Sequence, residues 1–295
     1  MMNITVIGSG TMGNGIAHVF AMSGFQVSLF DIYESALEKA MVTIGKNLDR
    51  IVAKGNLSEE EKTATLKRIT TYMDLKNAVK DSGLIVEAAT ENWELKSKLF
   101  RELDELAPAD CILASNTSSI SITRLASVTK RQDKVIGMHF MNPVPVMKLV
   151  EVIRGFNTSD EITEIIMNLS AKLGKSPVEV NDYPGFVANR ILMPMINEAI
   201  MTLSEGVAGV QEIDTVMKLG MAHPMGPLQL ADFIGLDVCH AILDVMYEGF
   251  GHPKYAPCQL LKKMVLAGKL GVKTKEGFYN YESGTKELVV SSYFK

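Results

Sequence analysis

The sequence predicts two domains, an open α/β sheet followed by an all-helical domain. Over the first part of the chain, short apolar segments typical of buried strands alternate with segments of helical periodicity. After Asn181-Asp-Tyr-Pro-Gly185 the alternation stops and only helical periodicity follows, with a Pro-Gly pair that interrupts both patterns. We therefore expect a sheet domain over residues 1–183 and a helical domain over residues 184–295, which suits a length of 295 residues.

The composition is typical of a soluble globular protein, with 47% hydrophobic and 22% charged residues. A net charge of −4 gives the surface no general attraction for nucleic acid. Cys111, Cys239 and Cys258 are far apart and form no C-x-x-C, so we expect neither a disulfide framework nor a metal site. No apolar run reaches the ~18 residues of a membrane span, and no signal peptide precedes the first strand. We expect a cytoplasmic protein without nucleic-acid or membrane partners.

The first strand, residues 4–7, leads directly into Gly8-Ser-Gly-Thr-Met-Gly13 and then a helix over residues 16–22. This is G-x-G-x-x-G between a strand and a helix. Gly8 permits the tight turn, Gly10 leaves room for a pyrophosphate, and Gly13 allows the helix to pack closely on the strand. The free N–H groups of the helix N-terminus would bind the phosphates.

The second strand, residues 26–30, ends in Asp31, which lies 18 residues after Gly13. An acidic residue here binds the 2′-hydroxyl of an adenosine ribose and repels a 2′-phosphate. The pattern favours a Rossmann-type domain that binds NAD rather than NADP. The alternative is a glycine-rich turn followed by a strand with an acidic end.

A helical insertion over about residues 34–68 follows and is longer than a plain crossover. Its first helix, residues 34–55, carries Lys46, Arg50 and Lys54 on one face. Such a strip is either a solvated charged face or a docking site for a phosphorylated substrate. Ser58-Glu-Glu-Glu61 is a capping box and starts the second helix.

The remaining sheet-domain elements follow from the same patterns. We expect strands over residues 69–72, 84–88, 111–114, 135–138, 148–153 and 177–180, and helices from residue 74 and over 93–106 and 159–173. The strand 111–114 ends in Ser115-Asn-Thr-Ser-Ser119. Polar residues at the carboxyl end of a strand in such a sheet often bind ligands, but they also often cap the next helix, and both possibilities stay open.

His139 and Glu151 flank a turn that contains Asn142-Pro-Val-Pro145. Two prolines exclude both a helix and a central strand between them, so the chain turns back and brings His139 within reach of Glu151. A carboxylate on one ring nitrogen fixes the tautomer and raises the basicity of the other, as in a general base. The alternative is a buried histidine with a satisfied partner.

The helical domain should contain five main helices, over residues 186–205, 210–219, 227–234, 236–247 and 257–267. Their wide apolar faces exceed what so short a domain can bury alone, which suggests a partner subunit. Asn189, near the start of the first helix, could reach toward a ligand or only cap the helix. Lys273, in a turn near the C-terminus, could likewise approach the cofactor or be solvated.

Five motifs together identify a resemblance. They are Gly8-Ser-Gly-Thr-Met-Gly13, Ser115-Asn-Thr-Ser-Ser119, His139-Phe-Met-Asn-Pro-Val-Pro-Val-Met-Lys-Leu-Val-Glu151, Asp182-Tyr-Pro-Gly-Phe-Val-Ala-Asn-Arg190 and Pro224-Met-Gly-Pro227. In this order the sequence resembles the single-function 3-hydroxyacyl-CoA dehydrogenases over essentially the whole chain, and most of all their bacterial 3-hydroxybutyryl-CoA members.

The resemblance implies a catalytic His139–Glu151 pair, with Ser118 and Asn189 holding the substrate oxygen and the histidine. It implies a nucleotide site that comprises Gly8, Gly10, Thr11, Met12, Gly13, Asp31, Glu91, Lys96, Asn116, Ser118, Asn142 and Lys273. Lys54 matches a lysine that meets coenzyme A, with Arg50 as a helper. The implied cofactor is NAD(H), the substrate a short-chain acyl-CoA, and the assembly a homodimer through the helical domain.

Three positions depart from the family pattern: Asn47 replaces a serine that contacts the coenzyme in some relatives, Met141 replaces an aromatic residue, and Lys275 replaces a glycine. Two other functions remain possible. One is a related dehydrogenase of a free hydroxy acid or sugar acid. The other is a nucleotide-binding protein without turnover.

Overall fold

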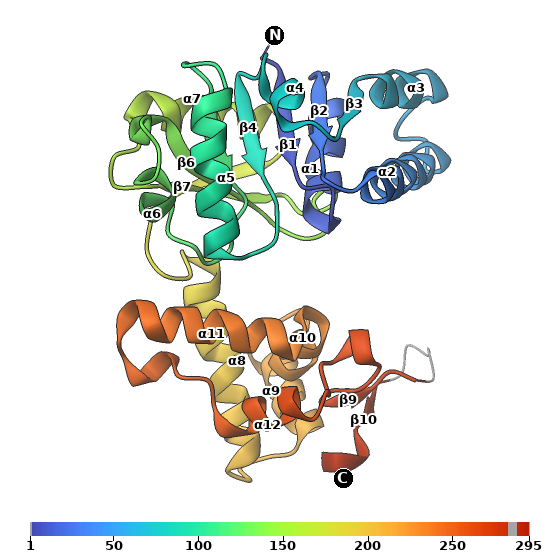
Figure 1. Cartoon of the computed structure of the whole chain (residues 1–295). Coiled ribbons are helices and arrows are strands. Elements are labelled where there is room, and N and C mark those ends of the chain that lie inside the picture. The colour runs from blue at the N-terminus through green and yellow to red at the C-terminus, as the bar shows by residue number, and fades with distance from the viewer. Residues whose placement is uncertain (1, 283–287, 295) are drawn as a thin grey trace. The chain divides into compact units, whose positions relative to one another are not determined.

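The computed structural model describes residues 2–282 and 288–294. The chain forms two compact units, Met1–Tyr183 and Pro184–Lys295 (Figure 1). Each unit has its own hydrophobic core. The α/β Rossmann-type domain and the helical domain predicted from the sequence are confirmed.

The first unit is built on an eight-stranded sheet. Its strands, in the order in which they lie side by side, are β3 (Ile69–Tyr72), β2 (Val27–Phe30), β1 (Ile4–Ile7), β4 (Leu84–Glu87), β5 (Ile112–Ser115), β6 (Val135–Phe140), β7 (Leu149–Arg154) and β8 (Ser176–Asn181). The pairs are parallel except for β6 with β7, which is antiparallel. The order 3-2-1-4-5-6 is the dinucleotide-binding order, in which ligands bind at the carboxyl ends of the strands.

Helices connect these strands. They are α1 (Thr11–Met22), α2 (Glu34–Ala53), α3 (Glu59–Lys67), α4 (Leu75–Val79), α5 (Trp93–Leu106), α6 (Ile122–Ala126) and α7 (Asp160–Lys172). Helices α1, α2 and α7 bury their apolar faces in one cluster with alternate residues of the strands, such as Val6 and Val86. The central strands are apolar on both faces because a parallel sheet is covered on both sides.

Helices α2 and α3 lie beside the sheet edge that ends in β3 (Figure 1). Helix α2 buries Leu37, Ile44 and Leu48 and leaves its basic face outside. The capping box at the start of α3 is confirmed: Ser58 accepts a hydrogen bond from the Glu61 N–H at 3.1 Å, and the Glu61 carboxylate accepts from the Ser58 N–H at 2.8 Å.

Two predicted boundaries are wrong in ways that matter for the site. Helix α1 begins at Thr11 rather than at residue 16, because Gly10 already serves as its N-cap and the chain becomes helical inside the glycine motif. Strand β6 runs to Phe140 rather than ending at residue 138, so His139 lies within the strand and not at its end. Pairing with β7 extends the strand over these residues.

The second unit is mostly helical. It contains α8 (Ala188–Ser204), α9 (Val210–Gly220), α10 (Pro227–Ile234), α11 (Leu236–Phe250) and α12 (Gln259–Leu266). A short antiparallel pair that the sequence did not predict, β9 (Tyr279–Asn280) with β10 (Val289–Val290), adds a small sheet. In the part of the chain that the structure describes, no helix has the length and apolar character needed to cross a membrane.

Candidate active site

The β1–α1 turn has the geometry that a pyrophosphate requires. Gly8 adopts a φ of +91°, and a Cβ there would lie 2.8 Å from the Ala88 carbonyl oxygen. A Cβ on Gly13 would lie 1.7 Å from the Gly8 carbonyl oxygen, so only glycine fits. A Cβ on Gly10 would meet no described atom within 4 Å, which leaves its side of the turn open. Thr11 and Met12 form the first turn of α1, where helix N–H groups have no intrahelical acceptor.

Asp31 directly follows β2 and is held beside this turn. One carboxylate oxygen accepts hydrogen bonds from the backbone N–H and the hydroxyl of Ser9 at 2.8 and 2.7 Å. The other accepts from the Tyr33 N–H at 3.1 Å. The acid that the sequence assigns to a ribose hydroxyl is therefore fixed in orientation.

His139 and Glu151 face each other across the antiparallel strands β6 and β7, as the turn between them predicts. They are register partners, and His139 Nδ1 lies 2.8 Å from Glu151 Oε2. Both side chains are buried, with 6% and 2% of their surface exposed. The Ser118 hydroxyl lies 2.9 Å from His139 Nε2. Because an ionised Glu151 can only accept, Nδ1 carries the proton and Nε2 is left to accept from Ser118 or from another hydroxyl.

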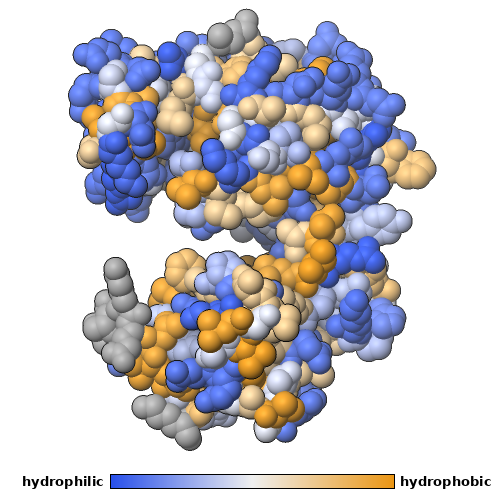
Figure 2. Space-filling model, turned by 180° about the vertical axis from the view of Figure 1, so that it is seen from behind, coloured by the Kyte–Doolittle hydropathy of each residue, from blue (hydrophilic) through white to orange (hydrophobic). Residues whose placement is uncertain are grey.

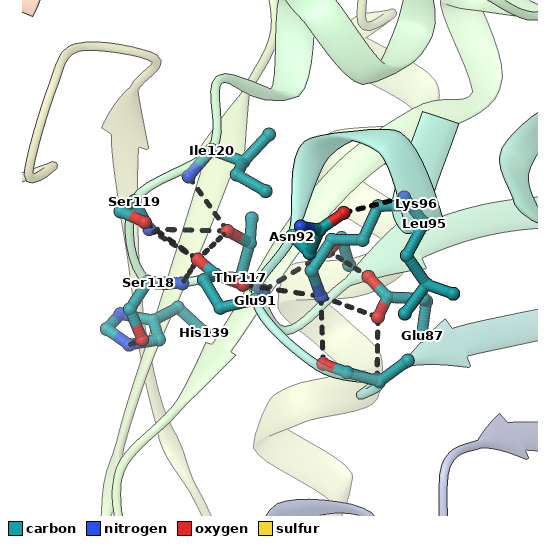
Figure 3. Close-up of polar contacts among 12 residues, drawn as sticks. Glu87, Glu91, Asn92, Leu95, Lys96, Thr117, Ser118, Ser119, Ile120 and His139 are labelled. Atoms are coloured by element: carbon teal, nitrogen blue, oxygen red, sulfur yellow. Dashed lines mark hydrogen bonds and ion pairs between the residues drawn. The ribbon is translucent and has the colours of Figure 1, made fainter. Parts of the chain in front are cut away.

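Ser118 lies in a tight turn after β5, and Glu91 organises that turn (Figure 3). One Glu91 oxygen accepts from the hydroxyl of Thr117, from the backbone N–H groups of Ser118 and Ser119 at 3.0 and 3.1 Å, and from the Ser119 hydroxyl at 2.8 Å. Partial burial acts to raise the pKa of Glu91, but the nearby Lys96 ammonium and the hydroxyl donors outweigh it and hold that pKa below its usual range. The sequence left open whether the polar cluster binds a ligand or caps the next helix. The N-cap of α6 is Ser121, outside the cluster, whose side chain accepts from the Arg124 N–H.

Lys96 and Glu87 form a buried pair behind this turn. Lys96, with 1% of its side chain exposed, donates to Glu87 at 2.6 Å and to the Ala89 carbonyl at 3.2 Å, and it lies 3.3 Å from Glu91. The sequence reading did not single out Glu87. Its one signal was a charged residue at the end of the otherwise apolar strand Leu84–Glu87.

Two asparagines of the implied nucleotide site lie at the ends of neighbouring strands. The Asn116 side-chain oxygen accepts from the Phe140 N–H at 2.9 Å and ties the end of β5 to β6. Asn142 begins the loop after β6 and precedes Pro143 through a cis peptide bond. Lys175, also missed from the sequence, holds this loop by donating to the carbonyl of Val144 and, at 2.8 Å, to that of Met147.

The other residues implied by the resemblance belong to α2 and to the second unit. Arg50 and Lys54 are exposed at the C-terminal end of α2, and Arg50 contacts Asn47 at 3.3 Å. In the second unit, Asn189 is buried in the first turn of α8. Lys273 lies in a 3₁₀ turn, Val272–Thr274, and pairs with Asp237 at 2.5 Å.

A glycine-rich nucleotide turn on a sheet of this order, with a His–Glu pair and a serine at neighbouring strands, defines the class of nicotinamide-dependent dehydrogenases. Two family models match the chain: that of the 3-hydroxyacyl-CoA dehydrogenase NAD binding domain, over residues 3–183, and that of the C-terminal domain of the same enzymes, over residues 185–281. The chain belongs to the 3-hydroxyacyl-CoA dehydrogenase family.

Individual proteins that are similar to this chain also belong to this group of enzymes or resemble them in structure. A probable 3-hydroxybutyryl-CoA dehydrogenase of Bacillus subtilis is 52% identical over 96% of this chain and 98% of its own length. The crystal structure of (S)-3-hydroxybutyryl-CoA dehydrogenase from Ralstonia eutropha superposes with a TM-score of 0.93, at 49% identity, over 96% of this chain and 99% of that one. A diketoreductase that acts on dicarbonyl compounds superposes with a TM-score of 0.83 at 32% identity, over 95% of this chain and 99% of that one.

Proposed function

We propose that the protein interconverts (S)-3-hydroxybutyryl-CoA, or another short-chain 3-hydroxyacyl-CoA, and acetoacetyl-CoA with NAD(H). The observation that carries the proposal is the buried chain of contacts from Ser118 through His139 to Glu151, at 2.9 and 2.8 Å. Such a chain can take a proton from a hydroxyl group and stabilise the imidazolium that results. The names of the close relatives support this substrate.

The cofactor is NAD(H), held by the β1–α1 turn, by Asp31 and by the polar residues at the ends of β5 and β6. The open side of Gly10 and the first turn of α1, which has no side-chain cap, fit a pyrophosphate. The position of Asp31 favours NAD over NADP. The nicotinamide ring, when bound, accepts or returns the hydride.

The protein's own part in the chemistry is the movement of one proton. His139 takes the proton of the 3-hydroxyl group through Nε2 as the hydride leaves the same carbon. In the reverse direction the imidazolium returns it to the developing alkoxide. Glu151 stabilises the charged ring through Nδ1, and Ser118 directs its hydroxyl to the same nitrogen that faces the substrate oxygen. We assign Asn189 to this oxygen on the resemblance alone.

The basic end of α2 is the proposed handle for coenzyme A. Arg50 and Lys54 are exposed and lie one helical turn apart, so their charges can meet the same phosphate-bearing group. Within the described part of the chain, the one side-chain hydrogen bond of either residue is the 3.3 Å bond from Arg50 to Asn47.

A second candidate is reduction of a dicarbonyl compound that carries no coenzyme A, which the 32% identity to the diketoreductase favours. A single assay separates the candidates: NADH oxidation with acetoacetyl-CoA, with free acetoacetate, and with no substrate. If the proposal is right, NADH is oxidised fast with acetoacetyl-CoA and not with free acetoacetate. Equal rates with both substrates would support the second candidate, and no oxidation with either would support a binding protein without turnover.

We also propose a cytoplasmic homodimer formed through the helical unit. The second unit exposes apolar side chains on several helices, visible as hydrophobic areas in Figure 2, and among them are Ile191, Leu219, Phe233 and Leu266. Leu219 and Leu266 have 81% and 88% of their surface exposed. The three cysteines are free, as in a reducing compartment. Sedimentation equilibrium at micromolar concentration tests the dimer, and a monomer mass would contradict it.

A further inference from the structure

Both charged groups of the buried Glu87–Lys96 pair make several hydrogen bonds. Glu87, fully buried, accepts from Lys96 and from the Ala89 N–H on one oxygen and from the Ser115 hydroxyl on the other, each at 2.6 Å. Lys96 has three acceptors, since Glu91 and the Ala89 carbonyl complete its set. An ammonium group has three N–H bonds, so none is left over for another partner.

Such a pair contributes little to folding by itself. Desolvation of two charges costs several kcal/mol per ion, and their attraction offsets that cost only when the geometry is very good. A pair of apolar residues of the same volume would often stabilise a protein as well. The pair is therefore better explained by what it holds in place.

Three segments meet at the Glu87 carboxylate: the end of β4, the first turn of α5 and the end of β5. Ser115 is the last residue of β5, and its oxygen accepts from the Thr117 N–H at 3.2 Å, inside the turn that contains Ser118. On the other side Lys96 neutralises Glu91, which holds the same turn through four donors. Ser115 and Glu91 thus both hold the turn, and the contacts of both lead back to Glu87. Figure 3 shows the part of this set that runs from Glu87 through Lys96 and Glu91 to the turn.

These contacts lead to Ser118, which lies beside the catalytic His139. Ser118 lies 2.9 Å from His139 Nε2, and a shift of a few tenths of an ångström would lengthen and weaken this hydrogen bond. Among the described hydrogen bonds, the Glu87 side chain contacts neither His139 nor the β1–α1 turn, so its influence on His139 passes through the Thr117–Ser119 turn.

We propose that Glu87 is a positioning residue for the proton-transfer step. It acts through Ser115, and through Lys96 and Glu91, which together hold the Thr117–Ser119 turn. This inference rests on the proposed function, because it concerns the histidine that is assigned there as acid and base. The lowered pKa of Glu91, which Lys96 helps to cause against the effect of burial, agrees with it.

The first test is Glu87→Gln, which keeps the shape of the side chain and removes its charge. With acetoacetyl-CoA and NADH, kcat should fall about 10- to 100-fold, while the KM for NADH should change less than threefold. The matched control is Asp104→Asn at the other end of α5, where a buried carboxylate pairs with Arg131 at 2.7 Å away from the turn. That variant should lose stability with kcat unchanged.

A second test asks whether the effect passes through Ser118. If it does, Glu87→Gln added to Ser118→Ala should lower kcat no further than Ser118→Ala alone. Losses that multiply would overturn the proposal, because independent roles give additive free energies. An unchanged kcat in Glu87→Gln would also overturn it.

A third measurement does not depend on the substrate. The ¹⁵N chemical shift of His139 Nε2 should change in Glu87→Gln in the direction seen in Ser118→Ala, and it should stay constant in Asp104→Asn. If Glu87→Gln fails to fold, Ser115→Ala removes only one hydroxyl and should give a two- to fivefold loss of kcat with the same change in shift. No change in shift overturns the inference. An inactive wild-type protein contradicts only the proposed function.

Discussion

Both units of the chain bury carboxylates, but they surround them with different donors. In the first unit, Glu87 and Glu151 meet groups that carry or acquire positive charge, Lys96 at 2.6 Å and His139 at 2.8 Å. In the second unit, the described hydrogen-bond donors to Asp214 and Asp232 are all neutral: backbone N–H groups and tyrosine hydroxyls, between 2.8 and 3.1 Å.

The two surroundings give carboxylates with different properties. Burial raises the pKa of Asp232 to about 6 against the pull of its hydrogen bonds, and it raises the pKa of Asp214 as well. In the first unit, the charge of Lys96 helps to hold the pKa of Glu91 below its usual range. In the first unit, the carboxylates beside cations orient the catalytic histidine and the turn that contains Ser118, whereas Asp214 and Asp232 join chain segments of the second unit.

The second arrangement is therefore structural. Asp232 joins α10 to the N–H groups of Phe278 and Tyr279, and Asp214 joins α9 to the start of α10. Each carboxylate also lies against a glycine, because a Cβ on Gly277 would come within 1.9 Å of Asp232. If this comparison holds, changes in the first unit should affect turnover, and changes at these aspartates should affect stability.

The largest expected effect is on turnover, from His139→Gln. General acid–base catalysis contributes about 10²–10⁴-fold, so kcat should fall by at least that range. Binding of NADH, followed by its fluorescence, should stay nearly unchanged, because the β1–α1 turn does not involve His139. A near-normal rate would remove His139 from the mechanism. Glu151→Gln should lower kcat less than His139→Gln, since the base itself remains.

The next largest effect is on stability, from Asp232→Ala. The change leaves two buried N–H groups and a tyrosine hydroxyl without their acceptor, and each such loss costs about 1–3 kcal/mol. We expect the free energy of unfolding in urea to fall by about 2–4 kcal/mol. Asp244 is half-buried and pairs with His240 at 3.0 Å on the same helix, and it gives the control variant, Asp244→Ala. Turnover per folded molecule should not fall, and a loss of kcat without a loss of stability would break the comparison.

The sequence predicts the helices, strands and turns around the site better than the side-chain contacts between them. Periodicity and capping rules locate most helices, and α5 and α10 have the predicted bounds. The turn with two prolines predicts the meeting of His139 and Glu151, because only 12 residues separate them and the chain must reverse between them. Local rules of this kind work when the partners lie on one hairpin.

The contacts of Glu87 with Ser115, and of Lys175 with Val144, could not be predicted in the same way. They join residues that are 28 and 31 positions apart in the sequence. Such contacts can be predicted only if the order of the strands in the sheet is known. Periodicity indicates that a strand exists but not which strand lies next to it. The β9–β10 pair was missed for another reason: strands of two residues are too short to show an alternation.

A smaller effect should come from Arg50→Ala with Lys54→Ala in the first unit. If the end of α2 binds coenzyme A, the KM for acetoacetyl-CoA should rise about tenfold with little change in kcat. The control is Lys39→Ala with Lys76→Ala, which removes the same charge from other exposed positions. Steady-state kinetics at two salt concentrations separates the two, because a direct phosphate contact loses its effect as salt rises. An equal KM in both double variants would leave α2 without this role.

The smallest expected effect is the change of protein stability with pH. A buried group in the first unit and one in the second unit should change stability in opposite directions. Burial lowers the pKa of His18 in α1 from 6.5 to about 4, and the charge of Lys175 acts in the same direction. The unfolded chain then binds a proton that the folded chain refuses, so this group makes the protein less stable as pH falls below about 6.5. For Asp232, with its pKa raised from 3.8 to about 6, the folded chain binds the proton first. This group makes the protein more stable as pH falls through 6.

Between pH 7.5 and 5.5 each group should change the free energy of unfolding by about 1 kcal/mol, and the two changes partly cancel. His18→Leu should remove the loss on acidification, so that the variant gains stability as pH falls. Asp232→Asn should remove the gain, so that the loss becomes steeper than in the wild type. Urea unfolding of the three proteins at both pH values measures these slopes. Equal slopes in all three would show that neither burial site governs the response to acid.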